Sequence, residues 1–533
     1  IHTGLDLQGV RAGGALGGSP VGGLVAAAGP AGRDGFEVAL DTGLIAAAFN
    51  TLWTATAVTV LSLGGGLAAA MVTERMAGPH RLLLRVAMLI PLAIPPFVAA
   101  LGWTEAYGPH GIPARLFGLS LPGVYGPAGV IAVLAVGGVP LAYAVIAASL
   151  ATRPEPDLEG AARASGASAR IAFLTITLRL LQPALAGAGV LVFVTTANSF
   201  AVPQVLGVPA GFTTLTTRIY QQLTFSASPA AFSAALVLAL VLLAIPLTAV
   251  GLGDTFLNRR EARRGGGGDG SDAGARLRHG PVLAVCAYLA ATTAVPLLAL
   301  VLTALTRAAG LPPTPGNWTL ENFRQSVGGV AGAGLAHSLE LAVVSAFGVL
   351  LLGGLVAAVG RGGVARPLAT VITATYALAG SGLALAVLLA YGRLLRYSLA
   401  LILVAYLAKF WALGYRPIAG SADRLPRDLL RAARASGAGP ATSVRTVVIP
   451  LLRPALAASW LLVFLAALHE LTISSLLYAP GSETLAVAVL NLQELGDVTV
   501  TAALAVLLTG LVLAAAGLLF LVRRLSRHLV TWA

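Results

Sequence analysis

Apolar runs long enough to cross a bilayer recur along the whole chain, separated by short polar stretches. A helix needs about 20 mostly apolar residues to span the roughly 30 Å of hydrocarbon in a membrane. Eleven runs have this length, and the Gly and Pro inside several of them are tolerated when neighbouring helices satisfy the freed backbone groups. The pattern predicts an all-α polytopic membrane protein. The predicted spans are 51–73, 82–103, 127–150, 181–202, 229–252, 281–304, 338–360, 367–390, 397–419, 454–475 and 499–522.

Arginines are concentrated in alternate polar stretches. Six lie in the Gly-rich segment 253–279, and others follow the first and last predicted spans. By the positive-inside rule these stretches face the cytoplasm, whereas 476–498, which has no Lys or Arg, faces outward. The arginine clusters that orient the chain in the membrane therefore account for its net charge of +13. It does not indicate a nucleic-acid partner, for which the basic residues would gather on one face or arm.

The phrase "AARASGA" occurs twice, inside two longer segments that align without a gap. The first is "DLEGAARASGASARIAFLTITLRLLQPAL" (157–185), and the second is "DLLRAARASGAGPATSVRTVVIPLLRPAL" (428–456). Upstream, "NTLWTATAVTVLSL" (50–63) resembles "HSLELAVVSAFGVL" (337–350). These similarities indicate a parallel duplication, in which two homologous helical halves have the same orientation in the membrane.

The duplication predicts the domain organisation. The second half starts with a span at 281–304 that has no counterpart before the first half. We therefore expect that a first span is missing and that an intact chain has twelve. The predicted regions are an N-terminal extracytoplasmic segment (1–46), a first membrane domain (47–252), a cytoplasmic Arg/Gly-rich linker (253–279), a second membrane domain (280–525) and a cytoplasmic tail (526–533).

Each repeated segment carries the signals of a short helix, a glycine turn and a second helix. An aspartate, Asp157 or Asp428, is a suitable N-cap ahead of each Ala-rich run. Gly166 and Gly437 are expected to end the short helices in the left-handed conformation, which glycine adopts at little cost. The second helix of each segment is expected to end where the next span begins, near Pro183 in the first segment and near Pro454 in the second.

The repeated segments resemble the EAA loop of binding-protein-dependent ABC importer permeases, with A-A-x-x-x-G followed by an apolar segment and a proline. The resemblance extends from about Asn50 to Arg524 and implies two fused MetI-like domains. It implies that each loop docks on one of two copies of a cytoplasmic ABC ATPase, and that an extracytoplasmic binding protein delivers the substrate. The implied docking residues are Asp157, Glu159, Ala161, Ala162, Ser165, Gly166 and Pro183 in the first loop, and Asp428, Ala432, Ala433, Ser436, Gly437, Pro450 and Pro454 in the second.

The glutamate of the family pattern falls on Gly160 in the first loop and on Arg431 in the second, with Glu159 one position away. Two fused halves resemble the ferric-ion and thiamine branch of the family. Segments 197–223 and 468–497 resemble ferric-ion permeases more than thiamine permeases. The resemblance thus implies import of a small solute across a bacterial inner membrane, with ferric iron as the first candidate and thiamine or an organophosphonate as alternatives.

The chain lacks the residues of a motor or an enzyme. A P-loop requires G-x-x-x-x-G-K-[ST], and the only lysine, Lys409, follows no glycine loop. The lone Cys286 excludes a CxxC metal or redox site, and no Ser/His/Asp or H-E-x-x-H spacing occurs. We expect no catalytic residue, metal site or cofactor. The alternative is an ion-coupled secondary transporter, because Lys409, His469, Glu470 and Glu340 are ionisable residues within predicted spans.

Polar residues occupy equivalent late positions in two spans, Asn198 and Ser199 in the first half and His469 and Glu470 in the second. We expect these four to line the outer part of a translocation path between the halves. The alternative is a polar cluster at the membrane–water boundary. Lys409 lies nearer the midplane, roughly 8–9 Å below Glu470 at 1.5 Å per residue. It is therefore expected to extend toward water rather than to pair with Glu470.

Overall fold

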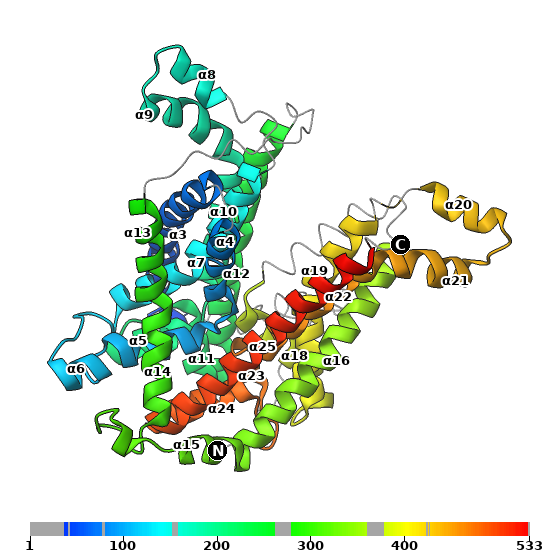
Figure 1. Ribbon diagram of the computed structural model, residues 1–533. Helices are drawn as coiled ribbons and strands as arrows, with labels where there is room; N and C mark the ends of the chain where they lie inside the picture. Colours follow the sequence, from blue (N-terminus) through cyan, green and yellow to red (C-terminus); the bar gives the residue numbers. More distant parts are fainter. Residues whose placement is uncertain are drawn as a thin grey trace. The chain divides into compact units, whose positions relative to one another are not determined.

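The chain forms helical bundles, as the hydropathy pattern predicts (Figure 1). In the part of the chain that the structure describes, the one β-type contact is an isolated bridge between Thr306 and Trp318. The chain divides into two compact units, here called the first unit (Arg33–Thr319) and the second unit (Leu320–Ala533). The computed structural model describes residues 37–40, 43–76, 80–151, 158–226, 228–261, 279–359, 378–422, 425 and 427–530.

The first unit contains the first half of the duplication together with the apolar helix that opens the second half. Its short η segments include three π turns, η3, η4 and η6. Its elements are α3 (Leu44–Arg75), α4 (His80–Ala87), η2 (Ile90–Ala93), α5 (Pro96–Tyr107), α6 (Ile112–Phe117), α7 (Pro127–Ala151), α8 (Leu158–Ala164), α9 (Ala169–Ala172), η3 (Phe173–Thr177), α10 (Leu178–Ala197), η4 (Pro203–Gly207), η5 (Val208–Ala210), α11 (Leu215–Thr224), α12 (Pro229–Glu261), α13 (His279–Leu289), η6 (Ala290–Ala294), α14 (Val295–Leu305) and η7 (Pro315–Asn317).

The second unit repeats much of this order and has a π turn, η8, at the position that matches η3. Its elements are α15 (Glu321–Val327), α16 (Gly329–Val359), α18 (Gly380–Leu395), α19 (Leu399–Ala422), α20 (Arg427–Ala435), α21 (Pro440–Ser443), η8 (Val444–Val448), α22 (Ile449–Leu468), α23 (Thr472–Leu477), α24 (Leu485–Glu494) and α25 (Val498–Val530).

Nine helices among the described residues are long and apolar enough to cross a membrane. The predicted span 82–103 is wrong as a single helix, because it lies within two helices that meet at 97°, His80–Ala93 and Pro96–Phe117. Ile94 and Pro95 each precede a proline, which disfavours helical backbone, and their ψ angles are 123° and 135°. This bent pair counts as a tenth span if it crosses once.

Three other predicted spans differ from the structure. The spans expected to begin near Pro183 and Pro454 begin earlier, since these prolines lie inside continuous helices, Ala169–Ala197 and Val444–Leu468. Membrane helices tolerate such internal prolines. Pro450 lies in the first turn of α22. Part of the predicted span 367–390 lies outside the described residues, and its described part belongs to the 16-residue helix α18.

The main helix pair of each unit packs backbone against backbone. α3 packs on α7 in the first unit, and α16 packs on α19 in the second. A Cβ added to Gly66 would lie 2.8 Å from the Tyr143 backbone nitrogen, and one added to Gly353 would lie 3.3 Å from that of Tyr415. Small residues allow this close approach, which is a main source of helix association in membranes.

Replacing Gly66 by valine is expected to destabilise the first unit by about 1–3 kcal/mol, the usual penalty of overpacking. The measurement is the thermal unfolding midpoint and the monodisperse fraction in mild detergent. Gly64→Val is the matched control in the same helix, because a Cβ at Gly64 meets no atom within 4 Å. Equal loss in both variants would contradict the packing argument.

The duplication is repeated in the hydrogen bonds of the two units. Within the first ten residues of α3 and of α16, a polar pair bonds the backbone at the N-terminus of α11 and of α24, respectively. Thr51 and Ser338, the second member of each pair, are both 2% exposed. The bonds are Asn50 Nδ2 to Thr213 O (2.9 Å) and Leu215 N–H to Thr51 Oγ1 (3.0 Å) in the first unit, and His337 Nδ1 with Glu483 O (3.0 Å) and Leu485 N–H to Ser338 Oγ (2.8 Å) in the second.

Candidate functional site

The two copies of the repeated phrase fold into the same helix–turn unit. The helices α8 and α20 are each followed by a glycine with positive φ, +91° at Gly166 and +82° at Gly437, as predicted. In both copies the alanine after this glycine donates its N–H to the second alanine of the phrase at 3.0 Å. This bond satisfies a carbonyl at the helix end. The backbone geometry of the two loops is therefore the same.

The side chains of the two loops are also arranged alike. Ser165 Oγ donates to Ala161 O at 2.9 Å, and Ser436 Oγ donates to Ala432 O at 3.0 Å, so both hydroxyls are satisfied within their own helix. The exposed residues of the phrase occupy the same positions in both copies, and Ala162 and Ala433 are half-buried. In each unit the loop helices extend beyond the ends of the long helices (Figure 1). Each loop thus presents a projecting surface of small side chains.

The predicted N-cap role of Asp428 is wrong. α20 begins at Arg427, so Asp428 lies in its first turn, where a carboxylate complements the helix dipole. Asp428 pairs with Arg431 at 3.4 Å, but the two side chains are 88% and 75% exposed, and such pairs contribute little to stability. Asp157, its counterpart, lies outside the described residues.

Glu159 links the first loop to the membrane helices. Arg75 Nη2 lies 2.9 Å and 2.7 Å from the two Glu159 carboxylate oxygens, and Thr177 Oγ1 donates to Oε1 at 2.8 Å. Arg75 is the last residue of α3, and Thr177 ends η3. Neither partner is predictable from a local sequence pattern, since they lie 84 and 18 positions from Glu159. The carboxylate ties α8 to a spanning helix.

The neighbouring residue Glu74 makes a second tie at the end of α3. Arg81 Nη2 donates to Glu74 Oε2 at 2.9 Å, and Arg85 donates to both Glu74 carboxylate oxygens, from Nε to Oε1 at 2.8 Å. The Glu74 side chain is only 8% exposed. The last two residues of α3 therefore hold α4 and α8 respectively, and the end of this helix joins three elements.

The second loop lacks the carboxylate that makes this tie. In the gapless alignment, Leu430 matches Glu159 and Val448 matches Thr177. Neither side chain can accept or donate a hydrogen bond. The two loops therefore share a backbone and differ in how their sequence can anchor them.

Replacing Glu159 by glutamine is expected to remove about 0.5–1 kcal/mol of anchoring, within the range of partly exposed ion pairs, and to speed limited proteolysis within the first loop about two- to fivefold. Arg75→Gln should have the same effect, and the double variant should be no worse, because both remove one interaction. Glu321→Gln, which breaks an exposed pair with Arg324 outside both loops, is the control. Additive losses in the double variant would contradict a shared role.

Lys409 pairs directly with Glu470, so the expectation that it extends toward water is wrong. Lys409 Nζ lies 2.8 Å from Glu470 Oε1, and Glu470 Oε2 accepts the Ile473 N–H at 2.8 Å. The axial estimate assumed one straight helix from 454 to 475. α22 instead ends at Leu468, and the chain turns before α23, which brings the carboxylate back to α19. Within the second unit, the Lys409 ammonium and the Glu470 carboxylate therefore compensate each other's charge.

The four residues expected on a translocation path lie at equivalent turns of their units. Asn198 and Ser199 follow the end of α10, and His469 and Glu470 follow the end of α22. Thr216 Oγ1 donates to Ser199 O at 2.8 Å. Glu470 is 6% exposed and engaged by Lys409 and the start of α23. Within each unit these polar residues thus lie where a spanning helix ends and the chain reverses.

A second buried carboxylate, Glu105, joins α5 to α14, and the sequence analysis did not single it out. Thr303 Oγ1 donates to Glu105 Oε2 at 2.8 Å, and Arg115 Nη2 lies 4.0 Å away. In the adjacent loop, burial first and the Glu105 charge second raise the pKa of Tyr125, so this phenol stays neutral to a higher pH than a free tyrosine. The pairing fixes the helix that opens the second half onto the first unit.

No group of three or more His, Cys, Asp or Glu side chains able to hold a metal ion occurs among the described residues.

Comparison with known proteins places the chain among transport proteins. The family described as "Binding-protein-dependent transport system inner membrane component" matches residues 62–260 and 349–530, which together make up more than half of the chain. The two matched regions contain the two repeated loops. The family match therefore falls once on each half of the duplication.

Three relatives illustrate the range of named transport systems. The thiamine transport system permease protein ThiP of Brucella abortus is 34% identical over 217 residues, 39% of this chain and 40% of the relative. The putative ferric transport system permease protein FbpB 1 of Haemophilus influenzae is 30% identical over 176 residues, 32% of this chain and 27% of the relative. The putative 2-aminoethylphosphonate transport system permease protein PhnV of Salmonella typhimurium is 27% identical over 205 residues, 37% of this chain and 77% of the relative. The match to the thiamine permease thus covers well under half of either protein.

Proposed function

Because the chain belongs to the family of binding-protein-dependent transport system inner membrane components, we propose that it is the membrane-spanning permease of an ATP-driven importer. It is a multi-pass inner-membrane protein. One observation carries the proposal: two loops of the same backbone geometry, with the same exposed small residues, project from the ends of the two units. A duplicated projecting element fits a partner that offers two equivalent grooves.

Each loop is the docking element for one cytoplasmic ATPase subunit. Small side chains on α8 and α20 let another protein approach the helix backbone closely, and the left-handed glycines set the angle at which each helix leaves the bundle. The docking residues are Glu159, Ala161, Ala162, Ser165, Gly166 and Pro183, with Asp157, in the first loop, and Asp428, Ala432, Ala433, Ser436, Gly437, Pro450 and Pro454 in the second.

Movement of the first loop reaches the membrane through α3. Glu159 binds Arg75 at the end of α3, and the adjacent Glu74 binds α4. When an ATPase pair closes on ATP and draws the loops together, this junction moves α3 and α4 with α8. In the second unit, which lacks the carboxylate, the pull passes along the continuous backbone from α21 through η8 into α22.

An ion-coupled transporter is the weaker alternative. The sequence contains no P-loop, so the energy must come from a separate ATPase or from an ion gradient. A gradient-driven carrier needs ionisable groups free to bind and release the coupling ion. Lys409 and Glu470, the charged pair inside the second unit, are engaged with each other at 2.8 Å. This contact favours a structural role for them.

The solute is small and is delivered by an extracytoplasmic binding protein. Segments 197–223 and 468–497 resemble ferric-ion permeases, whereas the match to a thiamine permease is longer and more identical than that to a ferric permease. Thiamine is therefore the first solute to test and ferric iron the second. The outer part of the path that this solute takes is assigned to the equivalent turns of the two units, which carry Asn198 and Ser199 in the first and His469 and Glu470 in the second; Glu470, through its pair with Lys409, holds the second turn in place.

The test is uptake by the purified permease in proteoliposomes, with candidate ATPase and binding-protein partners from the same cell. The proposal predicts uptake that requires ATP, the ATPase and one binding protein, with thiamine or ferric iron as cargo. Uptake driven by a proton or sodium gradient in the absence of the ATPase would contradict it.

A further inference from the structure

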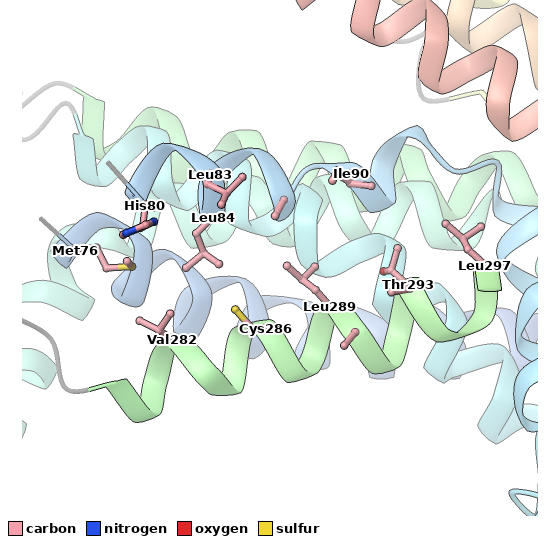
Figure 2. A pocket seen from close by; sticks show the side chains of 13 residues that line it. Met76, His80, Leu83, Leu84, Ile90, Val282, Cys286, Leu289, Thr293 and Leu297 are labelled. Atoms are coloured by element: carbon pink, nitrogen blue, oxygen red, sulfur yellow. The ribbon is translucent and has the colours of Figure 1, made fainter. Parts of the chain in front are cut away.

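An apolar groove of about 630 Å³ runs along the first unit between α4–η2 and α13–α14 (Figure 2). Both walls belong to segments apolar enough to lie within the membrane. Apolar side chains make up most of the lining, including Leu84, Leu289 and Leu297. Cys286, the single cysteine of the chain, lines the groove and is exposed.

The groove has the length of a lipid tail. Figure 2 shows His80 and Val282 toward one end and Leu297 at the other. Val282 and Leu297 are 15 positions apart, which is about 22 Å at 1.5 Å per residue. One leaflet of the hydrocarbon core is about 15 Å thick, half of the full span. A single acyl chain can therefore lie along these walls over its whole depth in the leaflet.

One end of the groove is basic. His80 lines it, and Arg81 and Arg85 belong to the same short helix. Close to this end, Arg75 pairs with Glu159, and Arg81 and Arg85 both pair with Glu74. The three arginines and two carboxylates leave one positive charge in excess. Basic pockets between spanning helices on the cytoplasmic side bind anionic lipid headgroups. The opposite end shows no such charge among its lining residues, Thr293 and Leu297.

We propose that this groove binds one acyl chain of an anionic phospholipid, with the headgroup beside His80. The acyl chain then fills the space between the bent helix pair of the first half and the helix that opens the second half. It holds the two walls apart while Trp103 Nε1 and Thr303 Oγ1 make the polar contacts that join these walls farther along. The site is a lipid-binding site distinct from the docking loops.

The buried hydroxyl of Thr293 distinguishes an acyl chain from a polar occupant. Thr293 is 8% exposed, lines the groove, and its Oγ1 has no hydrogen-bond partner in the described structure. A polar ligand would be held by this hydroxyl, so Thr293→Val would weaken its binding. An acyl chain gains nothing from the hydroxyl, so Thr293→Val should bind it at least as well.

The first experiment uses the native thiol. Cys286 of the delipidated full-length protein in detergent is reacted with N-ethylmaleimide while phosphatidylglycerol or phosphatidylcholine is added. With free lipid at about four times its dissociation constant, occupancy of the groove should slow labelling of the thiol about fivefold. Phosphatidylglycerol should reach this effect at a lower concentration than phosphatidylcholine. Labelling that is unaffected by lipid would overturn the proposal. A thiol that stays unreactive without lipid would also overturn it, because another part of the protein then covers the groove.

The second experiment counts retained phospholipid by native mass spectrometry. Ala290→Phe fills the groove and should release the lipid, whereas Ala287→Phe, on an exposed position of the same helix outside the groove, should retain it. Thr293→Val should retain it too. Equal retention in the two phenylalanine variants, or loss in Thr293→Val, would refute an acyl-chain site. The thiol experiment decides the matter if Ala290→Phe does not fold.

Discussion

Replacing Glu470 by glutamine should be among the most damaging single changes in the second unit. It leaves the Lys409 ammonium, which is only 25% exposed, without its counter-charge, and breaking a buried pair costs about 3–5 kcal/mol. Glutamine keeps an oxygen to accept the Ile473 N–H, so the start of α23 is preserved. The expected result is a large loss of folded protein and a lowered unfolding midpoint in detergent.

The double variant Lys409→Met with Glu470→Gln is the decisive companion. Removing both charges should recover most of the stability, because neither partner is then buried alone. Glu321→Gln, which breaks an exposed pair with Arg324, is the control and should change little. If the double variant is as unstable as Glu470→Gln, the pair does not account for the damage.

Tryptophan at Ala161 or Ala432 should disrupt ATPase docking without harming the membrane fold. Both alanines are exposed on loops that project from their units, so the larger side chain meets only the partner. Each substitution should weaken ATPase binding at least about tenfold, equivalent to about 1.4 kcal/mol. Both together should abolish ATP-dependent uptake. Binding is measured by co-purification from membranes and by titration with the purified ATPase.

Ala308→Trp is the matched control for these variants. Ala308 is also exposed, but it follows α14, at the end of that helix away from the Arg-rich linker. It should leave ATPase binding unchanged. Normal ATPase binding by the Ala161→Trp, Ala432→Trp double variant would show that the loops are not the docking elements.

Short-range signals made the loops predictable from the sequence. The turn at Gly166 and Gly437 depends on a glycine just after an Ala-rich run, and the structure has the left-handed conformation at both. The duplication was visible because the copies align without a gap, and the paired hydrogen bonds of Thr51 and Ser338 repeat it in three dimensions. The predicted N-cap at Asp428 is wrong because α20 begins one residue earlier, at Arg427.

Features that depend on where helices end or bend were not predictable. Hydropathy gives the same signal for a straight span and for the pair bent at Pro95. It also gave no sign that α22 ends at Leu468, and this end is what brings Glu470 to Lys409. The partners of Glu159 lie too far along the chain for any local pattern to join them to it.

The central claim is that both loops lie on the cytoplasmic face and are covered by the ATPase. It is tested most directly by cysteine substitution at Ser165 and Ser436, one at a time, in a Cys286→Ser background. Membrane-impermeant maleimide should label both positions in inside-out vesicles and neither in right-side-out vesicles, and added ATPase should protect both. Labelling of the two positions from opposite sides of the membrane would contradict the account.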